Sequence, residues 1–371
     1  MNFSTTESTT ENFQISLPSV WATQLAGTIE VIFSVIAIFG NFVFVAAVIL
    51  KKKLRTLANI FLVNLSFTDI LAALLVSSFS IDSFFRREWH LGHGLCVVHA
   101  ILHAYFSSTS LYLTAFIAIN RYIYIVHRHK YKSVTHKVSV TVMLIFAWMF
   151  PLVMFSAVIP KNAEYYPSIL RCQVNSSEQL LTFAVTGIVG FYLPSVITLI
   201  CYTLIFVSVR KSRRRVQSHS GHNTGTHVGP SQQEVRMLKV LVAVYLLILM
   251  GYLPFVVFIN VKWVLGLTPS PNVVLTIYPS LHVAGVLNPI LYGANNSNFR
   301  DAYKEFLSGK TFCTNTSRVR VDARRDGALC DNTGQLTHVS TNIVTISASL
   351  GAQMNVETNG AALSASVSTS V

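Results

Sequence analysis

Few side chains in this sequence combine the residue types that catalysis or metal binding requires. His99 and His103 are one helical turn apart and could bind a metal ion, but without a neighbouring carboxylate such a pair more often serves packing. Asp69 is the one acidic side chain that we expect to be buried deep inside an apolar segment. The five cysteines are widely spaced, which excludes a CxxC-type zinc cluster. No nucleophile–base pair is evident, so we predict neither an enzyme nor a cofactor.

The composition indicates that these residues belong to a membrane protein. The 371 residues are 52% hydrophobic and only 12% charged, and the mean hydropathy is +0.52. Soluble domains carry about a quarter charged residues, so this balance is typical of a polytopic membrane protein. A transporter or channel would contain internal repeats and a path of ionisable residues, and we find neither in the sequence.

Seven apolar stretches are long enough to cross a membrane as α-helices, which takes about 20 residues each. They are Leu25–Leu50, Leu57–Phe79, Leu95–Val126, Val138–Ile159, Leu180–Val209, Val240–Val261 and Val273–Tyr292. After them, an apolar stripe predicts an amphipathic helix on the inner membrane surface, formed by Phe299, Tyr303, Phe306 and Leu307. The predicted fold is all-α, a seven-transmembrane helix bundle followed by this cytoplasmic helix.

The distribution of Lys and Arg predicts the orientation of the chain. Of the 28 such residues, 23 lie on the side of the membrane that carries the C-terminal tail. The positive-inside rule places that side in the cytosol and the N-terminus outside, so the net charge of +13 needs no nucleic acid to explain it. We predict an extracellular N-terminus (1–24), a bundle (25–294), the amphipathic helix (295–308) and a disordered cytoplasmic tail (309–371).

Short motifs follow one another in a fixed order along the spans. They are Gly40-Asn41, Asn64-Leu65-Ser66-Phe67-Thr68-Asp69, Cys96 with Asn120-Arg121-Tyr122, Trp148, Pro194 with Tyr202, Pro254, and Asn288-Pro289-Ile290-Leu291-Tyr292. This ordered set resembles the rhodopsin-like class (class A) of G-protein-coupled receptors over residues 25–308. The resemblance implies a plasma-membrane receptor that binds an extracellular ligand and activates heterotrimeric G proteins.

The resemblance also implies a switch on the cytosolic side. Glu234 precedes Pro254 by twenty residues, about 30 Å of helix, which places it at the cytosolic end of the sixth span. Arg121 lies at the cytosolic end of the third span. The two could form an ion pair that holds these helices together at rest, or both could be solvated. Asn120 replaces the usual acidic neighbour of Arg121, so we expect raised basal activity. The other residues implied in coupling are Tyr122, Tyr202 and Tyr292.

A sodium site is implied by the polar residues deep in the bundle. Asp69, Ser110 and Asn288 match the family's site for an allosteric Na⁺, which favours the resting state. A protonated or water-bonded Asp69 is the alternative. Ala284 and Gly285 stand where the family often has further polar groups, which argues for low ion affinity.

The extracellular side holds candidate modification sites. The resemblance implies a disulfide between Cys96 and Cys172, on the side where disulfides persist. Asn2 and Asn175 begin sequons that would face outward, and are candidate glycosylation sites.

The cytoplasmic tail offers candidate partner sites. Cys313 just after the amphipathic helix is a candidate for palmitoylation, or an unmodified thiol. The hydroxyl-rich tail could be phosphorylated by receptor kinases and recruit arrestin. The final Thr369-Ser370-Val371 resembles a PDZ-domain ligand, although a tail rich in Ser, Thr and Val produces such an ending by chance.

The resemblance also predicts the lining of the ligand cavity, which comprises His103, Ser107, Tyr252, Phe255, Tyr278 and His282. Biogenic-amine receptors have an aspartate where His103 stands, so an amine ligand is disfavoured. Opsins have the retinal-binding lysine where His282 stands, so a visual pigment is disfavoured as well.

Within the class, local similarity is best to the melatonin receptors. The shared stretches are Lys53-Leu54-Arg55, Gly92 followed by Cys96, and Ala118-Ile119-Asn120-Arg121-Tyr122. The sequence differs from the melatonin receptors at positions where the ligand should be recognised. Gly190 stands where that family has a histidine in the fifth span, and Gly251-Tyr252 stands where it has a Cys-Trp pair in the sixth. We therefore expect a melatonin-receptor-like protein whose ligand is a small, largely uncharged molecule. A peptide or an acidic lipid is the alternative ligand, because the outer side carries the basic residues Arg86, Arg87 and Lys161.

Overall fold

The computed structural model describes residues 17–174, 180–219, 242–257 except 244, 247 and 255, 270–308 except 296, 328–330 and 336–338. Several residues singled out in the sequence lie outside this part of the chain, namely Asn2, Asn175, Glu234, Phe255, Cys313 and residues 369–371. The chain divides into two compact units, residues 1–308 and residues 309–371.

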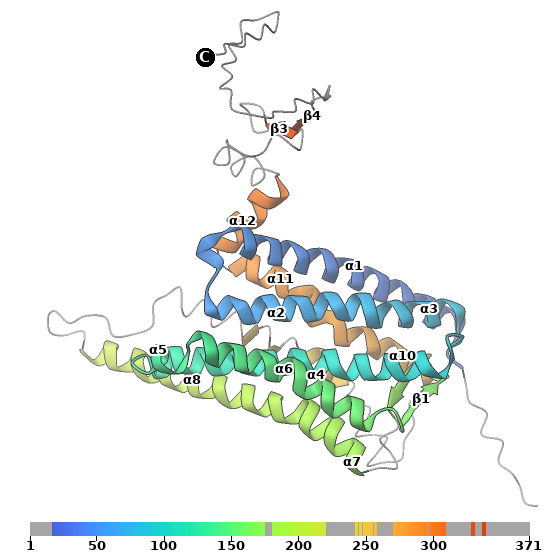
Figure 1. Cartoon of the computed structure of the whole chain (residues 1–371). Coiled ribbons are helices and arrows are strands. Elements are labelled where there is room, and N and C mark those ends of the chain that lie inside the picture. The colour runs from blue at the N-terminus through green and yellow to red at the C-terminus, as the bar shows by residue number, and fades with distance from the viewer. Residues whose placement is uncertain are drawn as a thin grey trace, which may run out of the picture. The chain divides into compact units, whose positions relative to one another are not determined.

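The first four predicted spans are long helices (Figure 1). The first is α1 (Val20–Leu50), and the third and fourth are α4 (Gly92–Val126) and α6 (Lys137–Val158). The second consists of α2 (Leu57–Ala72), the π-helical η2 (Ala73–Ser77) and α3 (Ser78–Arg86). The short helix η1 (Lys52–Leu54) connects α1 to α2, and the short helix α5 (Tyr131–Val134) connects α4 to α6.

The fifth and seventh spans combine several helical segments. The fifth consists of α7 (Leu180–Phe183), the π-helical η3 (Ala184–Tyr192) and α8 (Leu193–His219), and the described residues of 242–257 in the sixth are helical. The seventh consists of α10 (Pro271–Ile277), the 3-10 turn η4 (Tyr278–His282) and α11 (Val283–Asn295), and α12 (Ser297–Leu307) is the predicted amphipathic helix. Within the described residues, six helices are long and apolar enough to cross a membrane.

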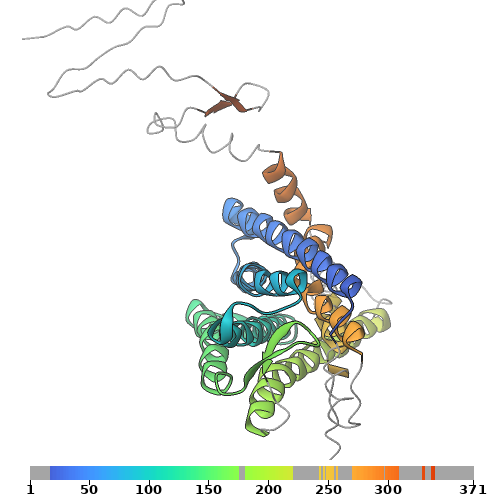
Figure 2. The same cartoon turned by 90° about the vertical axis from the view of Figure 1, so that its right-hand side faces the viewer.

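The segment between α6 and α7 forms a β-hairpin that the sequence did not predict. Its strands β1 (Ala163–Tyr166) and β2 (Arg171–Val174) are antiparallel, with Tyr165 opposite Cys172. Figure 2 views the end of the bundle that carries α3 and α10, and there the green hairpin lies across that end between the helices. The second unit contains a separate antiparallel pair, β3 (Ala328–Cys330) with β4 (Leu336–His338).

The π-helical segment η3 is held by side chains of α4. The Tyr112 hydroxyl donates to the carbonyl of Val189 (2.9 Å), and Ser108 Oγ donates to the carbonyl of Gly190 (3.0 Å). A π-helix displaces the regular i→i+4 ladder, and these hydroxyls satisfy carbonyls at that point. Gly190 itself lies so close to Phe155 of α6 that a Cβ there would be 2.8 Å from the Phe155 ring. The fourth and fifth spans therefore meet tightly beside the centre of the bundle.

Candidate ligand cavity, ion site and cytosolic switch

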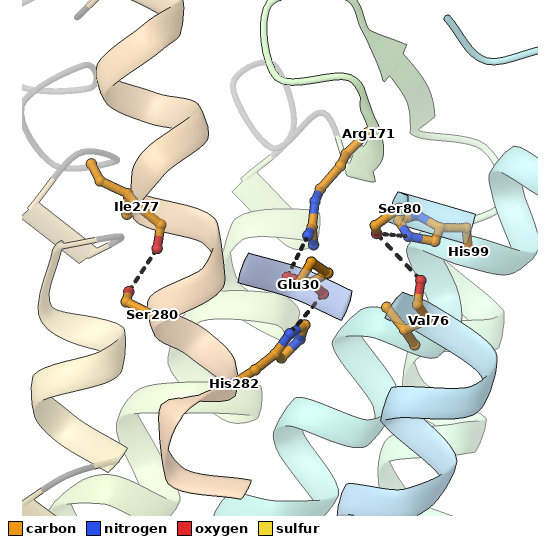
Figure 3. Close-up of polar contacts among 8 residues, drawn as sticks. All are labelled: Glu30, Val76, Ser80, His99, Arg171, Ile277, Ser280 and His282. Atoms are coloured by element: carbon orange, nitrogen blue, oxygen red, sulfur yellow. Dashed lines mark hydrogen bonds and ion pairs between the residues drawn. The ribbon is translucent and has the colours of Figure 1, made fainter. Parts of the chain in front are cut away.

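The hairpin is fastened to the outer end of α4. Cys96 in the first turns of α4 forms the predicted disulfide with Cys172 of β2. One turn further, His99 Nδ1 lies 3.2 Å from the Cys172 carbonyl and His99 Nε2 lies 3.1 Å from Ser80 Oγ (Figure 3). Because a carbonyl only accepts, Nδ1 is the donor to Cys172. His99 is thus a packing residue that joins the hairpin to the second span.

An upper cavity of about 180 Å³ lies between α4, η3, the sixth span and β2. Of the predicted lining residues, His103, Ser107 and Tyr252 face it. Gln173 and Gly190, which the sequence did not assign to the lining, also face it. Among the described residues that line this cavity there is no Asp, Glu, Lys or Arg. Apolar walls with a few polar groups are typical of sites for small molecules.

A second, deeper cavity of about 70 Å³ shares one wall with the first. His103, Ser107 and Tyr252 line both cavities. His282 lines the deeper one only. Most of the predicted ligand residues therefore surround two adjoining spaces.

The predicted sodium residues lie at the bottom of the deeper cavity. Asp69, Ser110 and Asn288 all line it, and Asn288 Nδ2 donates to Asp69 Oδ2 at 3.1 Å. Gly285 leaves room for this carboxylate, since a Cβ at that position would lie 3.2 Å from Asp69 Cγ. The arrangement gives a cation one carboxylate, one hydroxyl and one amide.

Tyr278 differs from the expectation for a cavity residue. Its side chain is fully buried, lines neither cavity and packs on the guanidinium of Arg171, 4.9 Å from the ring centroid. The reason is the 3-10 turn η4, in which successive residues advance by about 120° instead of about 100° around the axis. An α-helical register for the seventh span therefore predicts wrongly that Tyr278 lines a cavity, whereas it predicts correctly that His282 does.

Glu30 is the residue that the sequence reasoning missed. Asp69 was expected to be the deeply buried acidic residue, but Glu30 in the middle of α1 is also fully buried. Its carboxylate meets Arg171 of β2 and His282 of η4 (Figure 3). The signal was available, because a glutamate inside an otherwise apolar span is costly without a partner.

The predicted switch residues lie at the opposite end of the bundle. Asn120 is buried, and the Tyr122 hydroxyl lies 3.1 Å from His127 Nε2. Tyr202 stacks near Tyr245 of the sixth span at 5.8 Å and lies within the electrostatic reach of Arg121. Because Glu234 is outside the described residues, the ion pair between Arg121 and Glu234 stays a prediction.

The amphipathic helix α12 packs on the end of the seventh span. The rings of Phe299, Phe44 and Tyr292 form one cluster, with centroids 5.1 Å (Phe44–Phe299), 6.5 Å (Tyr292–Phe299) and 5.0 Å (Phe44–Tyr292) apart. The Tyr303 ring covers Gly293, where a Cβ would lie 2.6 Å away, and its hydroxyl donates to the Pro289 carbonyl at 3.1 Å. Burial raises the pKa of the Tyr303 hydroxyl, so this donor keeps its proton.

Comparisons with known proteins agree with this geometry. Residues 40–292 match the family described as 7 transmembrane receptor (rhodopsin family). The melatonin receptor type 1B-B of Danio rerio is 26% identical over 318 residues, which cover 82% of this chain and 89% of that protein. The melatonin receptor type 1A of Phodopus sungorus is 29% identical over 295 residues, which cover 77% and 81%.

A solved structure gives the same fold. The crystal structure of squid rhodopsin superimposes with a TM-score of 0.68 at 20% identity, covering 83% of this chain and 90% of that one. The relatives are receptors and not enzymes, and membership in their family implies a multi-pass membrane protein that couples to heterotrimeric G proteins. The chain therefore belongs to the rhodopsin family of seven-transmembrane receptors and is similar to the melatonin receptors.

Proposed function

We propose that this chain is a plasma-membrane receptor, with its N-terminus outside, that binds a small uncharged molecule in the upper cavity and signals through a heterotrimeric G protein. The observation that carries the proposal is the lining of that cavity. His103, Ser107, Tyr252 and Gln173 offer hydrogen bonds, and the other described lining residues are mostly apolar. Such a wall orients a neutral molecule by a few polar contacts and gives an ionic group no counter-charge.

A peptide or an acidic lipid is the weaker alternative. Arg86 Nε pairs with Asp82 Oδ1 at 2.8 Å, and Arg87 Nη2 donates to the Pro18 carbonyl at 2.8 Å. Neither arginine lines a cavity, and Lys161 is exposed outside both. These three basic residues thus lie away from the two cavities, which favours the neutral molecule.

One wall of the upper cavity argues against melatonin itself as the ligand. Gly190 stands where the melatonin receptors have a histidine, and the space beside it is filled by Phe155, 2.8 Å from a Cβ placed there. We infer that the ligand is recognised mainly from α4, the sixth span and Gln173, and not from position 190. We infer a neutral molecule that shares the small size of melatonin without needing its helix V contact.

The deeper cavity supports a second part of the proposal, an allosteric Na⁺ held by Asp69, Ser110 and Asn288. The switch that reads out the ligand comprises Arg121 with Glu234, framed by Asn120, Tyr122, Tyr202 and Tyr292. Glycosylation at Asn2 and Asn175, palmitoylation of Cys313, and tail contacts with receptor kinases, arrestin and a PDZ protein remain predictions from the sequence.

The test is a nucleotide-exchange screen of the full-length receptor with several Gα families against a library of neutral small molecules. Two serines on one face of α4 provide matched variants, since Ser107 lines both cavities and Ser110 lines only the deeper one. For a ligand found in the screen and assayed in choline chloride in place of sodium chloride, so that the ion site plays no part, we expect S107A to weaken potency and S110A to leave it unchanged. A surface-expressed receptor that never couples, either basally or with ligand, would refute the signalling function.

A further inference from the structure

Glu30 lies at the meeting point of three elements that are far apart in the sequence. His282 Nδ1 of η4 lies 2.8 Å from Glu30 Oε1, and Arg171 Nη2 of β2 lies 3.5 Å from Glu30 Oε2. Figure 3 shows the carboxylate of α1 between the guanidinium above it and the imidazole below it. One anion thus faces two basic side chains.

Arg171 is turned away from the ligand space. Its side chain is 1% exposed, and its guanidinium lies between the rings of Phe84 and Tyr278, 5.0 and 4.9 Å from their centroids. Neither Glu30 nor Arg171 lines a cavity, whereas His282 is 20% exposed and lines the deeper one. The imidazole therefore stands between the buried pair and the space where a ligand can enter.

The charge balance of this cluster determines what the adjoining space attracts. A buried guanidinium without a counter-charge is strongly unfavourable, and an incoming anion would relieve it. Glu30 supplies that counter-charge internally, and the same carboxylate lies beside His282. With Glu30 in place, the charge of Arg171 is balanced within the protein and does not recruit a carboxylate.

We propose that Glu30 is a specificity-determining residue, which keeps the cavities for uncharged ligands by neutralising Arg171 from within the protein, beside the cavity-lining His282. This inference rests on the proposed ligand site and names its ligand class. It also predicts that loss of Glu30 converts the same site into one that prefers carboxylates. A merely structural tether would lower stability without changing the charge of the ligand that binds.

The test uses three probes of nearly equal size that differ in charge: 3-phenylpropionate, 3-phenylpropanamide and 3-phenylpropylamine. Their affinities are measured on the purified full-length receptor from the dose dependence of its apparent melting temperature. We expect the amide to bind the wild type best. In E30Q the carboxylate should gain at least about tenfold relative to the amide, the scale expected when a buried cation loses its counter-charge.

Two further variants keep the test decisive if E30Q folds poorly. R171Q leaves Glu30 with His282 alone, so the preference should move the opposite way, toward the amine. The double variant E30Q/R171Q carries neither charge and should return to the amide. This sign reversal and restoration cannot arise from a general loss of stability.

The proposal is overturned if the wild type prefers the carboxylate, or if E30Q and R171Q keep the wild-type order of the three probes. Nucleotide exchange is measured on the same preparations. If the receptor couples to a G protein but its variants keep the wild-type order of the probes, only the role of Glu30 is refuted. If the variants change the probe order as expected but the receptor never couples, the signalling function is refuted.

Discussion

Replacing Gly251 by alanine tests how closely the sixth and seventh spans approach each other. A Cβ at Gly251 would lie 2.5 Å from the carbonyl oxygen of Ser280, which is a backbone atom of η4 and cannot rotate away. Ser280 Oγ also donates to the Gly251 carbonyl at 2.7 Å. The absence of a side chain at Gly251 is what permits this contact.

The cost follows from the geometry. An ordinary van der Waals contact begins at 3.4 Å, so the alanine must separate the two backbones by 0.9 Å at this level. Overpacking of this kind costs about 1–3 kcal/mol. The Ser280 hydroxyl keeps its other acceptor, the Ile277 carbonyl at 2.6 Å, so its bond to Gly251 adds little. We expect G251A to be destabilised by about 1–3 kcal/mol in total.

The assay is the apparent melting temperature of the purified receptor at one heating rate, because membrane receptors unfold irreversibly. G251A should melt several degrees below the wild type. Gly94 is a matched control, since a Cβ there meets nothing within 4 Å and G94A should melt like the wild type. S280A removes only the hydroxyl and should cost about 1 kcal/mol. If G251A melts together with G94A, the close approach of the two spans is wrong.

Three other variants probe separate contacts. C96A and C172A should each lower melting temperature and surface expression equally, and the double variant should add nothing, because one disulfide is lost in all three. D69N should abolish the rise in melting temperature when sodium chloride replaces choline chloride, and an unchanged sodium effect would contradict the ion site. Y303F should cost about 1 kcal/mol through its bond to the Pro289 carbonyl. Y303A should cost more, because the ring over Gly293 is lost too, and equal melting of these two variants would contradict that packing.

The sequence predicted the architecture well because hydrophobic length and ordered motifs carry it. The described spans begin within about five residues of the apolar stretches, although α3 and α8 continue seven and ten residues beyond the predicted ends, and α12 matches its predicted stripe. Local interruptions were not predictable in this way. The π-helical η3 depends on hydroxyls of α4 that become neighbours only in the folded bundle. The same limit applies to the β-hairpin, whose short strands give no distinct pattern.

The candidate site was predicted in part. His103, Ser107, Tyr252 and His282 were found because one α-helical register carries each motif to the cavity. Tyr278 was misplaced by the 3-10 turn. The Glu30 cluster was missed because the partners of Glu30, Arg171 and His282, come from other elements. Burial of a charge pair depends on tertiary packing that periodicity cannot reveal.

The fastening of the β1–β2 hairpin has a kinetic consequence. The hairpin is held to α4 by the disulfide, to the second span through His99 and Ser80, and to α1 through Arg171 and Glu30. For a ligand that passes this end of the bundle, the noncovalent contacts must open together before exchange can occur. Association would then be gated by hairpin opening well below the diffusion limit, and bound ligand would have a long residence time.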